Sequence, residues 1–263
     1  MLKGLYTAYT GMINEQNRMD VLTNNLANAD TIGFKKEGAT SQSFNSVFVD
    51  KIRDDSECLD LARRIGAANP GVKIGEGYTD FSQGPLQVTD NSYDVALGGE
   101  GFFTIEFTNK AGETSTMYTR DGNFQLTREG YLVTTDGDYV LGRANNNTTQ
   151  RIKVNPDLPV TIDEQGRIFQ NDRQLAQLKI TDFEDYNYLE HYGESYYMPV
   201  EGAEPVDATD CKVLQGYLET SNVSIVSEMV NMISVSRQYE ANQKVIQTYD
   251  SSLDAAVNQI GKI

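Results

Sequence analysis

The sequence predicts an α+β fold in which long helices at both ends of the chain form a coiled-coil layer and the middle is β-rich. A seven-residue spacing of apolar side chains near both termini is typical of helices that pack along one another. Its members are Leu5, Met12, Met19 and Leu26 near the N-terminus and Ile225, Met232, Tyr239, Ile246, Leu253 and Ile260 near the C-terminus. We predict four segments: an N-terminal coiled-coil helix (1–33), an irregular connecting arm (34–80), a β-rich outer domain of meander and hairpin modules (81–215) and a C-terminal coiled-coil helix (216–263).

The N-terminal helix is expected over residues 3–28, which corresponds to roughly 40 Å of helix. Asn28 and Gly33 mark its end, because both residue types tolerate the left-handed backbone that stops helices. The stripe is narrow and partly polar, so it fits a seam between helices better than the core-facing side of an ordinary amphipathic helix. The arm that follows contains a turn signal at Asn69-Pro70-Gly71, and we expect a short helix near 57–65.

The middle of the chain has the composition of strands joined by tight turns. Phe102–Phe107 alternates and is rich in β-forming residues, and turn dipeptides follow at Asp121-Gly122, Glu129-Gly130 and Asp136-Gly137. A second group of strand-like runs lies between 160 and 180, and the polar run 145–150 is expected to be a loop between two β modules. The tyrosine-rich stretch 186–197 is expected to be a loop, with partly buried rings favoured over a contact surface.

The C-terminal helix is expected over 222–260, with Ser221 or Asn222 as its N-cap and Gly261 as its stop. A second apolar line (Val226, Val230, Ile233) lies beside the heptad line in the first turns, which indicates more than one packing partner. Polar residues also lie in both helices, and two interpretations remain open: they fix the register of a helical seam, or they face water. These residues are Asn24, Asn25, Asn28, Asn231, Gln238, Asn242 and Gln243.

Composition excludes several functional classes. The net charge of −16 over 263 residues makes nucleic-acid binding through a basic surface improbable. Two cysteines and one histidine cannot supply a zinc site. Two free thiols are the default interpretation, with a Cys58–Cys211 disulfide as the alternative. His191 is assigned a surface or packing role.

No catalytic constellation is present in the sequence, so we predict neither an enzyme nor a cofactor or small-molecule substrate. The glycine-rich run 98–101 precedes a strand and is interpreted as a turn, because phosphate loops lead into helices. Asp136-Gly137-Asp138 does not continue as a calcium loop, since its sixth position is Leu141 and its twelfth is Asn147. No stretch is long and apolar enough for a membrane span, and the N-terminus lacks a cleavable signal pattern.

Five blocks of the sequence resemble the axial proteins of the bacterial flagellum, the rod and hook family. The first block is 5–12; the second, 22–35, contains Asn24, Asn25, Leu26, Ala27, Asn28, Gly33 and Phe34. Further blocks are Asp94–Phe103, Tyr118–Phe124 and the region 215–233, and all of them follow the order expected for the family. The overall size resembles a rod protein more than the larger hook protein, and the blocks 219–223 and 228–233 favour the distal over the proximal type.

The resemblance implies a structural subunit that polymerises into the tubular drive shaft of the basal body and transmits torque to the hook. Its partners would be further copies of the chain, other axial proteins and the flagellar export apparatus. Family members leave the cell through this apparatus and need no cleaved signal. Its location would be the basal body, outside the cytoplasmic membrane. The heptad residues would form the subunit interface. The alternative is a β-domain adhesin or scaffold whose helices form a closed coiled-coil oligomer.

Overall fold

The computed structural model describes residues 2–51, 63–109, 112–144, 148–171, 173–193, 195–208 and 211–260. The chain divides into two units that are each assembled from separate stretches of sequence. Unit 1 comprises Met1–Leu26, Glu37–Tyr78 and Ile225–Ile263, and unit 2 comprises Ala27–Lys36 and Thr79–Ser224. Both ends of the chain therefore belong to the same unit. The four-segment division predicted from the sequence stays a prediction.

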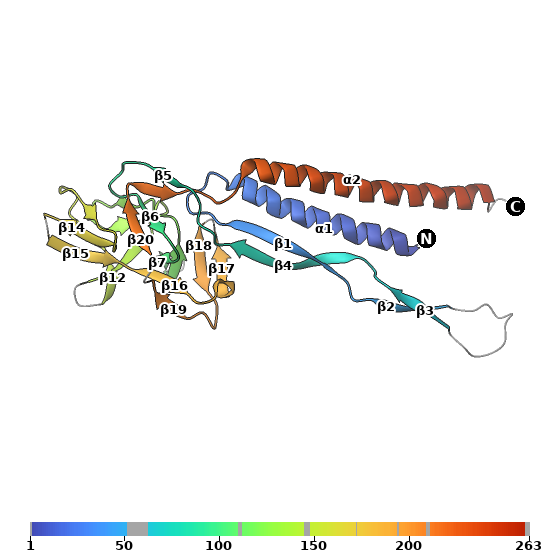
Figure 1. Ribbon diagram of the computed structural model, residues 1–263, viewed down its shortest axis with the longest axis horizontal. Coiled ribbons are helices and arrows are strands. Elements are labelled where there is room, and N and C mark those ends of the chain that lie inside the picture. Colours follow the sequence, from blue (N-terminus) through green and yellow to red (C-terminus); the bar gives the residue numbers. More distant parts are fainter. Residues whose placement is uncertain are drawn as a thin grey trace. The chain divides into compact units, whose positions relative to one another are not determined.

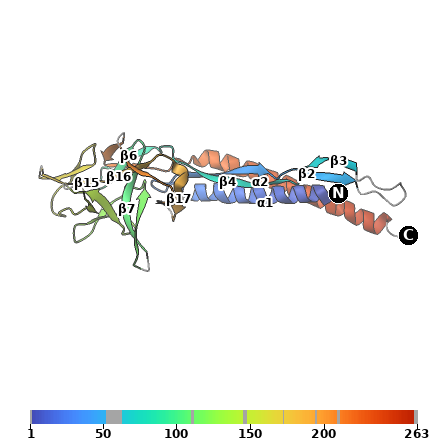
Figure 2. The ribbon, with the colours of Figure 1, turned by 90° about the horizontal axis from the view of Figure 1, so that it is seen from below.

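Unit 1 contains the two long helices and two β-ribbons. Helix α1 (Leu2–Ala27) and helix α2 (Ile225–Ala255) lie side by side and antiparallel, and a short π-helix, η2 (Ala256–Ile260), continues α2 (Figures 1 and 2). Strand β1 (Lys36–Ser43) pairs with β4 (Val72–Asp80), and β2 (Val47–Lys51) pairs antiparallel with β3 (Arg63–Ala68). The two terminal helices are confirmed to within three residues of their predicted bounds.

The arm predicted to be irregular is instead built from these four strands, so that expectation is wrong. The β1–β4 ribbon is secured by the neighbouring helix: the side-chain amide of Asn14 donates to Ser41 Oγ at 3.0 Å. Most of the short helix expected near 57–65 lies outside the described residues, while Arg63–Ala68 forms a strand. A two-stranded ribbon gives little hydrophobic periodicity to read, because both of its faces are half exposed.

The N-cap predicted for the second helix is also wrong. Helix α2 begins at Ile225, and the two proposed caps organise the preceding loop. Ser221 Oγ accepts a hydrogen bond from the backbone N–H of Val223 at 3.3 Å. The amide of Asn222 donates to the backbone oxygens of Asp80 (2.8 Å) and Ser82 (3.2 Å). The predicted stop, Gly261, lies outside the described residues.

Unit 2 is organised around one 13-stranded sheet. Its main path runs β13-β14-β15-β11-β7-β8-β18-β17, with β9, β10, β12, β16 and β19 attached at the sides. The strands are β7 (Phe102–Thr108), β8 (Thr114–Thr119), β9 (Gln125–Leu126), β10 (Leu132–Val133), β11 (Tyr139–Arg143), β12 (Thr149–Arg151), β13 (Thr161–Ile162), β14 (Arg167–Gln170), β15 (Arg173–Leu178), β16 (Ile180–Phe183), β17 (Leu189–Tyr192), β18 (Tyr196–Pro199) and β19 (Pro205–Asp207).

Two short pairs join the early part of unit 2 to its last strands. Strand β5 (Leu86–Val88) pairs with β21 (Tyr217–Glu219), and β6 (Val95–Gly98) pairs with β20 (Lys212–Gln215). The run 98–101 forms the turn between β6 and β7, as predicted, with positive φ at Gly99 and Gly101. A 3₁₀ turn, η1 (Tyr186–Tyr188), precedes β17.

The main core of unit 2 is apolar and fully covered. Adjacent residues of β7 point into different clusters: Phe103 lies in the largest one, and Phe102 packs with Tyr118, Phe183 and Tyr197. Each large apolar side chain buried in this way contributes roughly 1.5–3 kcal/mol before the cost of ordering it. The largest cluster contains Val95, Leu97, Phe103, Phe124, Leu132, Val140, Ile152, Val154, Val160, Ile168, Ala176, Leu178 and Val213.

Three predictions for the middle of the chain need correction. The run 145–150 does not separate two β modules, because Thr149 and Gln150 belong to β12, which pairs with β11 inside the same sheet. The Asp121-Gly122 dipeptide does not close a hairpin: the Gly122 carbonyl accepts a hydrogen bond from the Val95 N–H at 3.0 Å. The stretch 186–197 contains the β17–β18 hairpin, and its rings are not uniformly half-buried. Tyr186 is half-buried, Tyr188 and Tyr192 are exposed, and Tyr196 and Tyr197 are buried.

Candidate functional site

The helix pair of unit 1 is the first candidate site, and small residues bring its two helices together. A side chain on Gly4 would meet the Tyr249 ring within 3.0 Å, and one on Gly11 would meet the Asn242 amide at 2.9 Å. These two contacts are seven residues apart on both helices, which is the repeat of a helical seam. The face of α1 with the most buried side chains contains Ala8, Asn14, Glu15 and Asn25.

The predicted heptad residues flank this seam. Leu5, Met12, Met19 and Leu26 are half-buried on α1, and Met232, Tyr239 and Ile246 are half-buried on α2. Ile225 and Leu253 are exposed. The side chain of Ile260 is not among those the structure describes. The predicted heptad residues are therefore half-covered on most of both helices, while the most buried residues of α1 lie at other positions of the helix. Whether these residues join subunits stays a prediction.

The polar residues divide between the two interpretations that the sequence left open. Asn25 is completely buried; its Nδ2 donates to the Glu37 carbonyl at 2.7 Å and its Oδ1 accepts from the Glu37 N–H at 2.9 Å. This reciprocal pair holds the beginning of β1 against α1, so Asn25 fixes a strand on a helix and not the register of a helical seam. Asn242 is half-buried opposite Gly11. Four others are exposed: Asn24, Asn231, Gln238 and Gln243.

A buried ion-pair node in unit 2 is the second candidate site. We define the node as Lys35, Arg120 and Glu219, whose side chains are each 3% exposed or less. Lys35 Nζ lies 2.6 Å from Glu219 Oε1, and an Arg120 guanidinium nitrogen lies 3.3 Å from Glu219 Oε2. One carboxylate therefore holds two cations that are far apart in the sequence.

Backbone groups complete the node. The Lys35 ammonium donates to the Ser82 carbonyl at 2.9 Å, and Glu219 Oε1 accepts from the Gly84 N–H at 2.9 Å. The Arg120 guanidinium also lies 5.3 Å from the centre of the Phe102 ring, where a cation–π interaction partly replaces its lost water. Burial lowers the pKa of the Lys35 ammonium below its ordinary value, although the charge of Glu219 opposes this effect. The arrangement is a structural clamp, because each polar contact joins separate stretches of chain.

The loop that carries the predicted motif residues fits closely against the node. Gly33 has φ +70° and its N–H donates to the Glu219 carbonyl at 2.8 Å; a side chain there would meet the Asp121 nitrogen at 2.5 Å. Phe34 is buried, and its ring meets the His191 ring edge-on at 6.2 Å, which confirms a packing role for that histidine. The other motif residues lie before the loop: Asn24, Leu26 and Ala27 in the last turn of α1, and Asn28 directly after it.

Lys35, Arg120 and Glu219 lie in the sequence blocks 22–35, 118–124 and 215–233, but no local pattern predicts a role for them. Lys35 and Glu219 are 184 positions apart, so no periodicity links them. The available signal was chemical: each charge lies beside residues that become fully buried, such as Phe34, Thr119 and Leu218. A charge within a buried block indicates a partner, because an unpaired charge is costly to bury.

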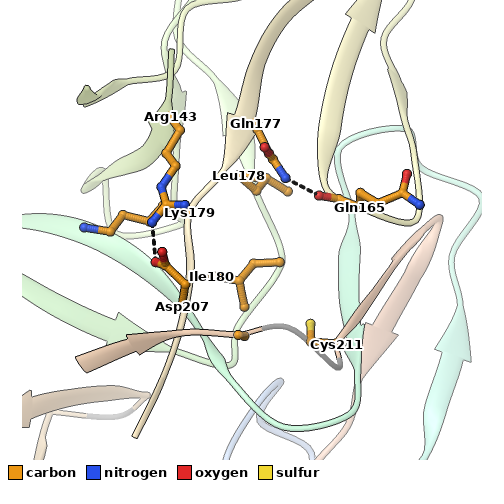
Figure 3. Close-up of a pocket in the computed structure, with 9 residues that line it drawn as sticks. Arg143, Gln165, Gln177, Leu178, Lys179, Ile180, Asp207 and Cys211 are labelled. Atoms are coloured by element: carbon orange, nitrogen blue, oxygen red, sulfur yellow. Dashed lines mark hydrogen bonds and ion pairs between the residues drawn. The ribbon is translucent and has the colours of Figure 1, made fainter. Parts of the chain in front are cut away.

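A polar cleft on unit 2 offers no comparable chemistry (Figure 3). It is lined by Arg143, Lys179, Asp207 and Cys211 among others, and Arg143 forms an ion pair with Asp207. Cys211 carries a free thiol whose pKa is raised by burial, while Cys58 lies outside the described residues. Among the residues that the structure describes, no group of three or more His, Cys, Asp or Glu side chains could hold a metal ion. None of the described helices has the length and apolarity to cross a membrane.

Comparison with known protein families matches three regions of the chain. The model for "Flagella basal body rod protein" matches residues 5–35. The model for "Flagellar hook protein FlgE/F/G D1 domain" matches residues 96–170, and that for "Flagellar basal body rod FlgEFG protein C-terminal" matches residues 214–260. Lys35 lies in the first region, Arg120 in the second and Glu219 in the third, so the three regions meet in the node.

Individual relatives extend the match to nearly the full chain. The flagellar basal-body rod protein FlgG of Buchnera aphidicola subsp. Schizaphis graminum is 34% identical over 269 residues, covering 96% of this chain and 98% of the relative. The flagellar hook-basal body complex protein FlhO of Bacillus subtilis is 35% identical over 277 residues and covers 100% of both chains. The flagellar basal-body rod protein FlgF of Caulobacter vibrioides is 30% identical over 264 residues, again covering 100% of both. These matches give no support to a closed-oligomer adhesin.

Proposed function

This chain belongs to the family of flagellar basal-body rod proteins, a structural family and not an enzyme family, and from this premise we propose that its terminal helices build the inner coiled-coil layer of the rod. In this proposal copies of the chain stack into an open helical tube in the basal body, and the β-rich unit 2 forms the outer wall. The tube transmits torque from the motor toward the hook. The distal type is favoured, because relatives named FlgG recur among the matches.

One observation carries the proposal: the packing of the two helices on each other covers only part of their apolar surface. Val235 is the single residue of α2 that is both apolar and buried among the described side chains, whereas five apolar residues in its first three turns are exposed. Repeated contacts between different patches of neighbouring copies produce an open helical assembly when the rotation does not close. If copies of the chain polymerise, neighbouring copies cover the apolar surface of α2 that a single copy leaves exposed to water.

The residues proposed for the subunit interface are those of the two heptad lines. Met232 and Ile246 are half-buried on the covered face of α2, so a carboxylate at either position would lose part of its contact with water. We expect Met232→Asp and Ile246→Asp each to abolish polymerisation while leaving the β-rich unit folded. The matched control is Gln243→Asp, which places the same charge at an exposed position of the same helix.

The test is imaging of basal bodies in which this chain carries a label. We expect label along the rod in the wild type and the control, and shafts that stop short in the two seam variants, with soluble chain accumulating. Label elsewhere than on the rod would overturn the proposed function. Normal rods built from both seam variants would leave the structural role standing and overturn the interface assignment.

Two further parts of the proposal follow from the family alone. The proposed partners are other copies of the chain and the neighbouring axial proteins of the rod and hook. The proposed route out of the cell is the flagellar export apparatus, which requires no cleaved signal. Deleting the export apparatus should retain the labelled chain inside the cell, and its appearance outside under those conditions would contradict this route.

A further inference from the structure

Two exposed apolar lines lie on the helix pair of unit 1, one on each helix. The α1 line consists of Tyr6, Tyr9 and Ile13, which are 61%, 54% and 41% exposed. The α2 line consists of Val226, Met229, Val230 and Ile233, of which Val226 is 74% exposed. Spacings of three and four residues put each set on one helical face. Contiguous apolar surface on both helices needs a partner, because water is a poor solvent for it.

Both lines lie in stretches without exposed charge. Residues 4–14 contain no charged side chain, and residues 225–236 contain only Glu228, which is completely buried. The chain as a whole carries a net charge of −16, so two copies repel one another over most of their surfaces. The two lines are therefore places where copies can approach without a like-charge penalty, which identifies a second copy of the chain as the partner.

Within one chain the two lines cannot touch. The contacts of Gly4 with Tyr249 and of Gly11 with Asn242 fix the antiparallel register, in which the α1 line lies level with residues near 240–247 of α2. The α2 line lies about 14 residues away along the helix, which corresponds to about 20 Å at 1.5 Å per residue. Each line is left to be covered by another molecule.

The surface beside the α2 line has a shape that suits an aromatic ring. A shallow hollow is lined by Val230, Ile233, Ser234, Arg237, Gln238 and Ala241. Its lining combines the apolar side chains of Val230, Ile233 and Ala241 with the polar groups of Arg237 and Gln238. A tyrosine from the α1 line presents an apolar ring to the former and a hydroxyl to the latter, and its ring can also lie under the Arg237 guanidinium.

We propose that the α1 line of one copy packs on the α2 line of the next, with the two copies displaced by about 20 Å along the helix axis. The contact joins two different patches, so each copy keeps one patch of each kind open for a further neighbour and the assembly does not close. This inference rests on the proposed function and adds a second contact between copies to the one proposed for the heptad lines.

Cysteine cross-linking in isolated basal bodies tests the pairing directly. Cells express two versions of the full chain, both with Cys58→Ala and Cys211→Ala, one carrying Tyr9→Cys and the other Val230→Cys. Mild oxidation should produce a covalent dimer, and the bond must join two chains because each carries one thiol. The matched control replaces Val230→Cys with Gln243→Cys, an exposed polar position on the same helix. We expect at least tenfold more dimer from the first pair.

A charge pair gives an independent readout. Tyr9→Glu and Val230→Lys should each reduce the amount of chain in basal bodies at least tenfold, and the double variant should recover most of it, since opposite charges then meet between copies. Absence of the wild-type chain from basal bodies would overturn the proposed function itself. Two results would overturn only this pairing, provided that the wild-type chain is found in basal bodies. One is the absence of a preferred cross-link, and the other is normal assembly of the single charge variants.

Discussion

Removing the negative charge of the node tests whether Lys35, Arg120 and Glu219 act as the clamp of unit 2. Glu219→Gln keeps the size and shape of the side chain and keeps one oxygen that can accept from the Gly84 N–H. It removes the only carboxylate that Lys35 and Arg120 share, at 2.6 Å and 3.3 Å. Two cations then remain in a site where every member is 3% exposed or less.

The expected cost is large because the change leaves buried charge without compensation. Breaking a buried ion pair by removing one partner costs about 3–5 kcal/mol. For a unit of this size each kcal/mol lowers the midpoint of thermal unfolding by about 2–4 °C, so we expect a drop of roughly 6–20 °C. Lys35→Met should cost less, because the remaining Arg120–Glu219 pair is electrically balanced.

The matched control is Glu106→Gln. Glu106 binds Arg151 through two hydrogen bonds of 2.6 Å and 3.0 Å, but the side chains of this pair are 21% and 42% exposed. Exposed pairs contribute at most about 1 kcal/mol. The assay is urea and thermal unfolding followed by near-ultraviolet circular dichroism of the tyrosines, since the chain has no tryptophan. Equal destabilisation by the two substitutions would refute the clamp, because burial would then make no difference.

Three further substitutions probe other parts of the chain. Gly33→Ala should destabilise unit 2 by clearly more than Gly193→Ala in urea unfolding: both glycines have φ near +70°, which costs alanine about 1 kcal/mol, but only Gly33 faces backbone atoms. Burial raises the pKa of Asp121 to about 6, so the folded state retains a proton that the unfolded state has released. The free energy of unfolding should therefore fall by up to about 3 kcal/mol as the pH rises from 3.8 to 6, and Asp121→Asn but not the exposed Asp157→Asn should flatten that slope in unfolding measured across this range. Val235→Asp should separate the helix pair and reduce the ellipticity at 222 nm, whereas Ser234→Asp at the exposed neighbouring position should not, because only Val235 is buried.

The helices could be predicted from the sequence because their signal is local. The seven-residue spacing and the terminators Asn28 and Gly33 fixed α1 to within a residue at each end. The strands of the middle were found for the same reason, since Phe102–Phe107 alternates and turn glycines such as Gly130 and Gly137 adopt positive φ. The pattern did not reveal which face of α1 is most buried, because small or polar residues such as Ala8, Gly11 and Asn25 add little to a hydrophobic pattern although they are buried.

The parts that escaped prediction depend on partners distant in sequence. The ribbons between 36 and 80 gain their order from pairing with each other and from α1, so their own residues show weak strand character. The node requires three charges brought together by the whole fold of unit 2, and no local rule joins position 35 to position 219. The continuity of the sheet was missed likewise, because Thr149 and Gln150 are polar and nothing in their sequence shows that they pair with β11.

The node has a further consequence, which follows from where the chain passes between its two units. The chain crosses four times, after residues 26, 36, 78 and 224. Residues near the last three crossings are bonded to one another within unit 2, because the Lys36 N–H donates to Asn222 at 2.7 Å and Asn222 donates to the Asp80 carbonyl. Gly33, which lies between the first two crossings, donates to the Glu219 carbonyl. A force carried along any one of these connections therefore reaches a shared set of hydrogen bonds instead of a single peptide segment. Because the buried charges of the adjoining node are costly to separate, we expect this set to resist opening under load, which is the behaviour that a load-carrying subunit requires.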